Sequence, residues 1–192
     1  MSRALIVIDV QESFRARTEE WAGTNNPKIT EKVNRLVALA RAAGDLVVWV
    51  LHSEPGSGDV FDPALGQVRL MPELDSGADD PVVHKTSHNA FTTTSLQQLL
   101  TMHGVTELTV CGIRTEQCVE TTTRVGSDLG YLVTFVTDAT ATNPITRNGV
   151  TLSAEEIVQR TEFALAERFA TISTVAELEL AALEQPTADR AR

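Results

Sequence analysis

Six short runs of apolar residues, several of them rich in β-branched side chains, alternate along this chain with segments of helical periodicity. The runs cover residues 4–10, 46–51, 82–85, 108–113, 131–137 and 170–173. Continuous apolar runs of this length are typical of strands that are buried on both faces, as in parallel sheets. Because such strands alternate here with helices, the sequence predicts a doubly wound α/β fold. We expect a six-stranded, mostly parallel sheet between two helical layers, a three-layer α-β-α architecture.

Helix-start signals lie between these runs. Asn26 followed by Pro27 predicts an N-cap and a first helical position, and Gly44 predicts the end of that helix. The capping box, a Ser or Thr followed three residues later by Glu or Gln, predicts further helix starts. Such boxes occur at residues 94–97, 153–156 and 174–177.

The length of the chain fits one domain. With 192 residues, of which 42% are apolar and 22% charged, the composition is ordinary for a globular protein. We expect a single domain at residues 1–184 and a frayed tail at residues 185–192. Residues 11–26 are expected to form a polar loop. Residues 52–80 have little periodicity, which predicts a functional loop or a lid.

Charge and cysteine content narrow the function classes. A net charge of −10 argues against a nucleic-acid binder, which needs a basic face to neutralise phosphates. Two cysteines, Cys111 and Cys118, are too few for a disulfide framework and fit a reducing cytoplasm. The apolar runs are far shorter than the about 20 residues that span a bilayer, and the first ten residues lack a signal-peptide pattern. We therefore expect a cytoplasmic protein without membrane contact.

Three reactive side chains lie where predicted strands end. Asp9 interrupts the first run near its end, Lys85 ends the third run, and Cys118 follows the fourth run after a glycine turn and a short loop. Each residue could also have a purely structural role. Asp9 could be a turn aspartate, Lys85 a solvated lysine and Cys118 a small buried side chain. In doubly wound sheets, however, ligands bind beyond the carboxyl ends of the strands. Together the three residues predict a site at that edge.

The chemistry of these three side chains points to cysteine hydrolysis. A thiol attacks as its thiolate, which a helix amino terminus at Cys118 and a nearby Lys85 ammonium would both stabilise. Asp9 can accept the thiol proton and later deliver it to a leaving amine. These groups are sufficient to cleave a carbon–nitrogen bond through a thioester. The alternatives are thiol redox chemistry with Cys111 and a scaffold without catalysis.

Three sequence motifs carry a resemblance to a known family. They read ALIVIDVQESF from residue 4, VVHKTSHNAF from residue 82 and CGIRTEQCVETTTR from residue 111. In their order and spacing they resemble the D-x-Q-x-x-F, lysine and G-[IV]-x-T-x-x-C-V pattern of the isochorismatase-like cysteine hydrolase superfamily. The resemblance extends over nearly the whole chain. It implies the Rossmann-like fold of that superfamily and a homodimer or homotetramer.

The resemblance also implies roles for particular residues. Asp9, Lys85 and Cys118 would form the catalytic triad, and the peptide bond between Ile113 and Arg114 would be cis. The backbone N–H groups of Arg114 and Cys118 would then form the oxyanion hole. The substrate would be a small amide, ureido or lactam compound.

Departures from the family pattern narrow the chemistry further. Nicotinamidases of this superfamily carry a metal-binding D-x-H cluster after the second strand, whereas this chain has only His52 in VLHSEPGSGD. We therefore expect neither a metal nor another cofactor. Isochorismatases that cleave a vinyl ether lack the cysteine, so Cys118 favours amide chemistry. Isochorismate or nicotinamide hydrolysis and a non-catalytic binding homologue remain the alternatives.

The substrate-binding residues are less constrained. Arg114 could bind a substrate carboxylate, or it could pair with Glu116 or with another subunit. The acidic residues of the long loop suggest the opposite, a cationic amide. These are Glu54, Asp59 and Asp62. Phe14 and Phe91 are expected to form an apolar pocket wall, with core packing as the alternative.

Overall fold

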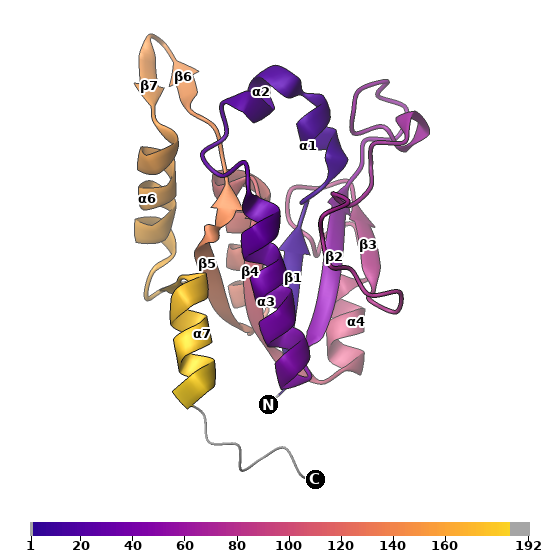
Figure 1. Cartoon of the computed structure of the whole chain (residues 1–192), viewed down its shortest axis with the longest axis vertical. Coiled ribbons are helices and arrows are strands. Elements are labelled where there is room, and N and C mark those ends of the chain that lie inside the picture. Colours follow the sequence, from indigo (N-terminus) through magenta and orange to yellow (C-terminus); the bar gives the residue numbers. More distant parts are fainter. Residues whose placement is uncertain (1, 185–192) are drawn as a thin grey trace.

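A computed structural model of the protein describes residues 2–184, so the expected tail at residues 185–192 lies outside the described residues. Its centre is a six-stranded sheet in the order β3-β2-β1-β4-β5-β8 (Figure 1). The strands are β1 (Ser2–Ile8), β2 (Leu46–His52), β3 (Val82–Lys85), β4 (Val105–Ile113), β5 (Leu132–Ala141) and β8 (Thr171–Ser173). Every neighbouring pair in this sheet is parallel, which confirms the predicted α/β fold.

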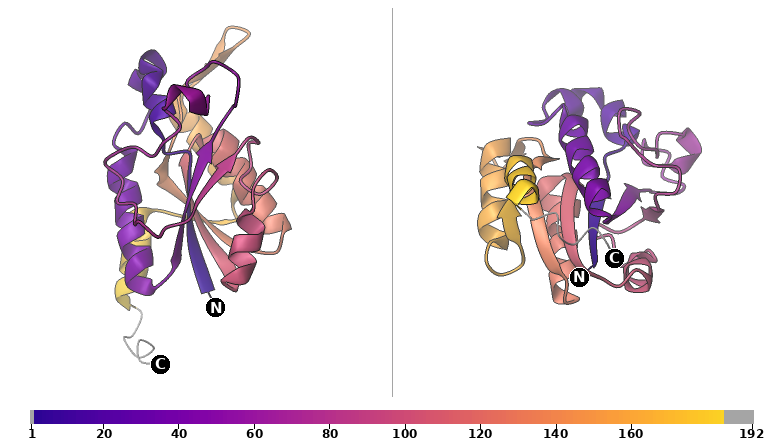
Figure 2. Two further views of the ribbon diagram at one scale, coloured as in Figure 1. Left: turned by 90° about the vertical axis from the view of Figure 1, so that its right-hand side faces the viewer. Right: turned by 60° about the horizontal axis from the view of Figure 1, so that its bottom comes forward.

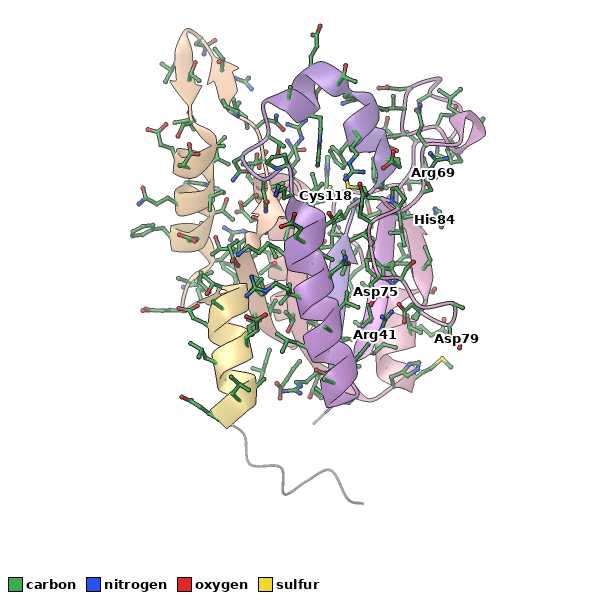
Figure 3. All side chains as sticks on the ribbon, viewed as in Figure 1. Arg41, Arg69, Asp75, Asp79, His84 and Cys118 are labelled. Atoms are coloured by element: carbon green, nitrogen blue, oxygen red, sulfur yellow. The ribbon has the colours of Figure 1, made fainter. Side chains whose placement is uncertain are left out.

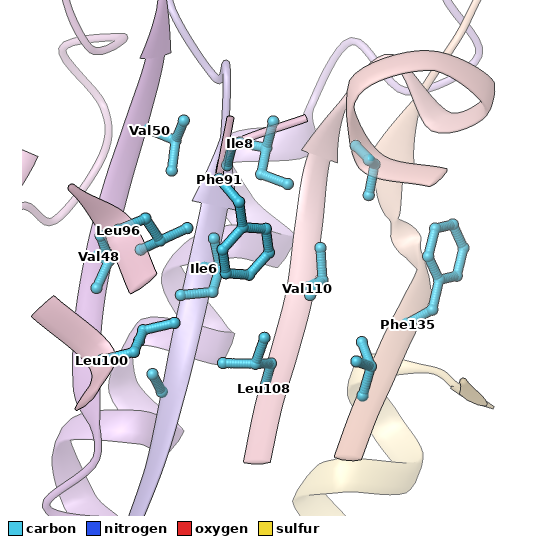
Figure 4. Close-up of a cluster of buried hydrophobic side chains, with 14 of the residues drawn as sticks. Ile6, Ile8, Val48, Val50, Phe91, Leu96, Leu100, Leu108, Val110 and Phe135 are labelled. Carbon is cyan, nitrogen blue, oxygen red and sulfur yellow. The ribbon is translucent and has the colours of Figure 1, made fainter. Parts of the chain in front are cut away.

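Helices cover both faces of the sheet (Figure 2). On one face lie α3 (Ile29–Ala43) and α7 (Val175–Glu184). On the other lie α4 (Leu96–Met102) and α5 (Glu120–Asp128), with α6 (Ala154–Leu165) packed beside α5. The pleat of the strands divides the core between the two faces, because successive side chains point to opposite sides. In β1, Ile6 and Ile8 pack toward α4 and α5 (Figure 4). Leu5 and Val7 pack toward α3 on the opposite face.

The segment before α3 differs from the expected polar loop. It contains two short helices, α1 (Glu12–Ala16) and α2 (Thr18–Ala22). The prediction that Asn26 caps α3 is wrong, because the helix begins at Ile29. The Asn26 amide instead donates to the backbone carbonyls of Asp138, at 3.1 Å, and Thr140, at 3.0 Å. Asn26 therefore ties this segment to β5.

A β-hairpin was not predicted. It consists of β6 (Ile145–Arg147) and β7 (Val150–Leu152), which pair antiparallel. The turn between them is Asn148-Gly149, with φ angles of 52° and 77°. Asn-Gly is the residue pair that prefers such tight hairpin turns, so the sequence did contain the signal.

Two of the three predicted capping boxes form. Ser153 with Glu156, and Thr174 with Glu177, each exchange both hydrogen bonds of the motif. The third does not form, because the Thr94 hydroxyl oxygen accepts the N–H of Leu96 at 3.0 Å and not that of Gln97, and the N-cap of α4 is Ser95. Between β2 and β3 the long loop contains one short 3₁₀ helix, η1 (Pro63–Leu65). Within residues 2–184, none of the helices is both long and apolar enough to cross a bilayer.

Candidate active site

The structure brings Asp9, Lys85 and Cys118 together at one edge of the sheet. Asp9 follows β1 in a left-handed conformation, with φ 56°, and its N–H donates to the Val50 carbonyl at 2.8 Å. Lys85 is the last residue of β3. Cys118 lies in η2 (Thr115–Val119), a π-helical turn that connects β4 to α5. Figure 3 shows Cys118 at the end of the sheet near α1 and α2.

The Lys85 ammonium is the centre of this cluster. Its Nζ lies 2.8 Å from Asp9 Oδ2 and 3.3 Å from Cys118 Sγ. It also lies 3.2 Å from the Ser87 carbonyl oxygen and 3.3 Å from His52 Nδ1. The side chains of Asp9 and Lys85 are completely buried. One cation therefore contacts both the carboxylate and the thiol, shielded from water.

Burial controls the protonation of the acidic groups. Burial, and after it the nearby Asp9 charge, raise the pKa of the Cys118 thiol to about 12, although the Lys85 ammonium opposes both. Burial also raises the pKa of Asp9, and Lys85 only partly offsets this. Beyond the ion pair with Lys85, neither Asp9 oxygen accepts an aligned hydrogen bond from residues 2–184. Asp9 is thus a strengthened base with free acceptor positions beside the thiol.

A close contact between two strands brings the Cys118 turn up to Asp9. Gly112 of β4 has φ 130°, and a Cβ atom at this position would lie 1.9 Å from the Ile8 carbonyl oxygen. Only glycine permits this approach of the β4 backbone to the end of β1. The next peptide bond, between Ile113 and Arg114, is cis, as the family resemblance implies.

Gln11 is a site residue that the sequence did not single out. Its side chain is completely buried and joins the ends of β1 and β2. Gln11 Oε1 accepts the His52 N–H at 2.8 Å, and Gln11 Nε2 donates to the His52 carbonyl at 3.0 Å. The glutamine of the D-x-Q-x-x-F motif therefore fixes the backbone of the residue that faces Lys85. The Asp-x-Gln spacing was the available signal.

His52 contacts Lys85, a role that the sequence does not predict. Within residues 2–184, no group of three or more His, Cys, Asp or Glu side chains is arranged to hold a metal ion. The His52 ring instead lies between Lys85 Nζ and Glu54 Oε1, the latter 3.1 Å from Nε2. The register of β2 and β3, which pairs His52 with Lys85, explains this contact.

Arg114 forms an ion pair with Glu20 of α2, and its guanidinium lies 5.9 Å from the centre of the Phe14 ring. The expected alternative pairing with Glu116 is wrong, since Glu116 accepts a hydrogen bond from the Thr142 hydroxyl instead. Phe14 meets Phe61 edge to face at 5.1 Å. An aromatic and arginine layer therefore lies over this edge of the sheet.

Phe91 does not join Phe14. It packs in the core among side chains of β1, β4 and α4, and it stacks on Tyr131 with the ring centres 6.0 Å apart (Figure 4). Phe91 is therefore a core residue, which was the alternative to a place in the pocket wall. The expected pairing of Phe14 with Phe91 is not formed, because Phe14 meets Phe61 instead, and a substrate contact at Phe14 stays a prediction.

The acidic residues of the long loop have local partners. Asp59 lies 2.6 Å from the Arg17 guanidinium, and its pKa is lowered by the Val60 N–H and then by Arg17. Asp62 accepts the N–H groups of Gly58 and Ala64, which lower its pKa. Glu54 contacts His52. Because each charge is already engaged, the acidic loop is weaker support for a cationic substrate than the sequence suggested.

The two cysteines should differ in reactivity. Cys111 is completely buried in β4, and burial raises its pKa; among the described residues 2–184, no charged group offsets this. Cys118, in contrast, lies 3.3 Å from the Lys85 ammonium, which is itself paired with Asp9, and a neighbouring cation favours the reactive thiolate form. We expect iodoacetamide at neutral pH to label Cys118 stoichiometrically, at least about ten times faster than Cys111. Peptide mass spectrometry measures both sites, and equal labelling would contradict the expectation.

The chain is similar to proteins in a known family. A family model described as the Isochorismatase domain matches residues 3–177. A streptothricin hydrolase from Streptomyces noursei is 35% identical over 188 residues, 96% of this chain and 73% of that protein. A ureidoacrylate amidohydrolase from Klebsiella pneumoniae is 31% identical over 170 residues, 71% of this chain and 72% of that protein. The crystal structure of a cysteine hydrolase from Pseudomonas syringae pv. phaseolicola is 26% identical, with a TM-score of 0.85 and coverage of 94% and 92%.

Proposed function

Because the chain belongs to the isochorismatase family of hydrolases, we propose that it cleaves a carbon–nitrogen bond of a small amide, ureido or lactam compound. The observation that carries this proposal is the position of Lys85 Nζ, 2.8 Å from Asp9 Oδ2 and 3.3 Å from Cys118 Sγ. The names of two similar proteins, a streptothricin hydrolase and a ureidoacrylate amidohydrolase, support a hydrolase of this class. The nucleophile is Cys118.

In the first half of the reaction, Cys118 Sγ attacks the carbonyl carbon of the substrate. The thiol proton passes to Asp9, whose raised pKa makes it a suitable acceptor. The net charge of the three side chains is unchanged by this transfer, which matters because Asp9 and Lys85 are completely buried and unbalanced charge is costly there. Asp9 then gives the proton to the leaving nitrogen as the carbon–nitrogen bond breaks. The amine departs, or stays attached to the acyl group where the substrate is a lactam, and a thioester remains on Cys118.

In the second half, water attacks the thioester carbon and gives a proton to Asp9. The carbon–sulfur bond breaks, the carboxylic acid leaves, and the proton returns to sulfur. Throughout, the Lys85 ammonium stabilises whichever of Asp9 and Cys118 carries the negative charge. Cys118 is therefore a neutral thiol before the reaction and a thiolate during its attack on the substrate. Asp9 holds the proton in between.

The oxyanion of the tetrahedral intermediates is assigned to the backbone N–H groups of Arg114 and Cys118. Backbone donors suit this role because they are fixed before the charge develops. On the substrate side, Phe14 offers an apolar surface, and Arg114 offers a guanidinium that Glu20 already binds. A carboxylate of the substrate would have to replace Glu20 on Arg114. Amides with and without a carboxylate should therefore both be screened.

The thioester itself provides the test. Amides that release ammonia or an amine in the presence of the protein are identified first, and turnover is then stopped with acid. We expect the peptide that contains Cys118 to gain the mass of the acyl group, while the Cys111 peptide keeps its mass. The acylated protein accumulates only where hydrolysis of the thioester is slower than its formation. Esters of the same acids are therefore also used, because they acylate a thiol faster than amides do. Turnover without acylation of Cys118 under either condition would refute the mechanism.

A further inference from the structure

His52 is held against the catalytic cluster by the sheet itself. It is the last residue of β2, and in the parallel ladder it is paired with Lys85, the last residue of β3. Paired residues on neighbouring strands project to the same side of the sheet. His52 Nδ1 accordingly lies 3.3 Å from Lys85 Nζ, and the His52 side chain is only 13% exposed.

The chemistry of the two groups fixes the tautomer of the ring. A lysine ammonium has three hydrogens to donate and accepts none, so a hydrogen bond to it requires an unprotonated Nδ1. The ring hydrogen must then be on Nε2, and Nε2 lies 3.1 Å from Glu54 Oε1, an acceptor. The hydrogen bonds therefore run in one direction, from Lys85 to His52 and from His52 to Glu54.

Three further contacts hold the imidazole in place. Gln11 binds both the N–H and the carbonyl of His52, which fixes its backbone. The ring also meets Phe61 edge to face, with the centres 5.5 Å apart. A side chain restrained from so many sides is suited to holding a partner in position.

We propose that His52 is a positioning residue that holds Lys85 Nζ between Asp9 and Cys118. The Lys85 side chain is long and has several rotatable bonds, so contacts on more than one side are needed to keep its charge in one place. Asp9, Cys118 and the Ser87 carbonyl contact Nζ from β1, η2 and the segment after β3, and His52 contacts it from β2. This inference rests on the proposed function, in which Lys85 stabilises the Cys118 thiolate.

The test compares the rate of Cys118 alkylation by iodoacetamide at neutral pH in four proteins. His52→Phe keeps a ring against Phe61 but removes the acceptor, and we expect the rate to fall about ten-fold. His52→Asn places its amide oxygen where Nδ1 was, and we expect a rate within about two-fold of the wild type. His84→Leu, at an exposed position of β3 away from Cys118 (Figure 3), is the matched control and should leave the rate unchanged.

Two results would overturn the proposal. One is a wild-type rate in His52→Phe, and the other is an equally slow rate in His52→Phe and His52→Asn, which would indicate a packing role. Circular dichroism checks the fold, and His52→Leu replaces His52→Phe if the larger ring disturbs it. The proposed hydrolase function can be refuted independently of the role of His52. That is the outcome if the alkylation rates of the four proteins are as expected but no amide acylates Cys118. If acylation occurs and the His52 variants alkylate normally, the function stands and the role of His52 does not.

Discussion

Replacing Cys118 by alanine is expected to abolish hydrolysis, with kcat/KM falling at least about a thousand-fold for any amide that the wild type cleaves. Without the sulfur no thioester can form, and Asp9 and Lys85 have no nucleophile to activate. Initial rates of ammonia or amine release, followed for both proteins at the same enzyme concentration, measure the effect. A Cys118→Ala protein that keeps full activity would refute the assignment of the nucleophile.

The control for this prediction lies seven residues earlier in the chain. Cys111 is at least as buried as Cys118, and the one hydrogen bond of its sulfur within residues 2–184 is a long one, 4.0 Å, to the Ile6 carbonyl oxygen. Cys111→Ala removes the same atom from the core and should cost about 1 kcal/mol of stability. We expect this variant to retain activity. Urea unfolding of both variants separates loss of chemistry from loss of fold.

Gly112→Ala is expected to lower the free energy of unfolding by at least about 4 kcal/mol, or to prevent folding. The added Cβ would lie 1.9 Å from the Ile8 carbonyl oxygen, which belongs to a central strand and cannot move aside. The clash would separate β4 from β1, two strands that pair along most of their length. Urea unfolding followed by circular dichroism measures the loss.

Gly130→Ala separates the clash from the cost of the backbone conformation. Gly130 also has a positive φ, 92°, but a Cβ there would meet no heavy atom within 4 Å. Its replacement should therefore cost only the strain of that conformation, about 1–2 kcal/mol. Similar losses in the two variants would mean that the β1–β4 approach tolerates a side chain.

The fold was predictable because its signals are local. The central strands β1 and β2 contain continuous apolar runs, and β3 has the bounds that the sequence predicts, residues 82–85. The convergence of Asp9, Lys85 and Cys118 followed from one rule, that the carboxyl ends of parallel strands share an edge. The rule required only that each residue be placed at the end of a strand. No knowledge of distances was needed.

Contacts between segments far apart in the sequence were not predictable in the same way. Arg114 pairs with Glu20, which lies 94 residues earlier, and no periodicity connects them. Asn26 is a good N-cap residue, but its side-chain nitrogen donates to two carbonyls of β5, Asp138 and Thr140, and α3 begins three residues later. His52 was considered as a metal ligand because its partner Lys85 is identified only when the strand order is known. In each case tertiary contacts override a local preference.

The strand order of the sheet also sets the sequence in which the active site can assemble during folding. β1 lies between β2 and β4. Asp9 and Lys85 can meet once β1, β2 and β3 have paired, whereas Cys118 arrives only when β4 closes a connection of about one hundred residues with β1. Pairing over such a separation is slow because the entropy of loop closure opposes it. The reactivity of Cys118 toward iodoacetamide during refolding would therefore report the docking of β4, a late event on the folding pathway.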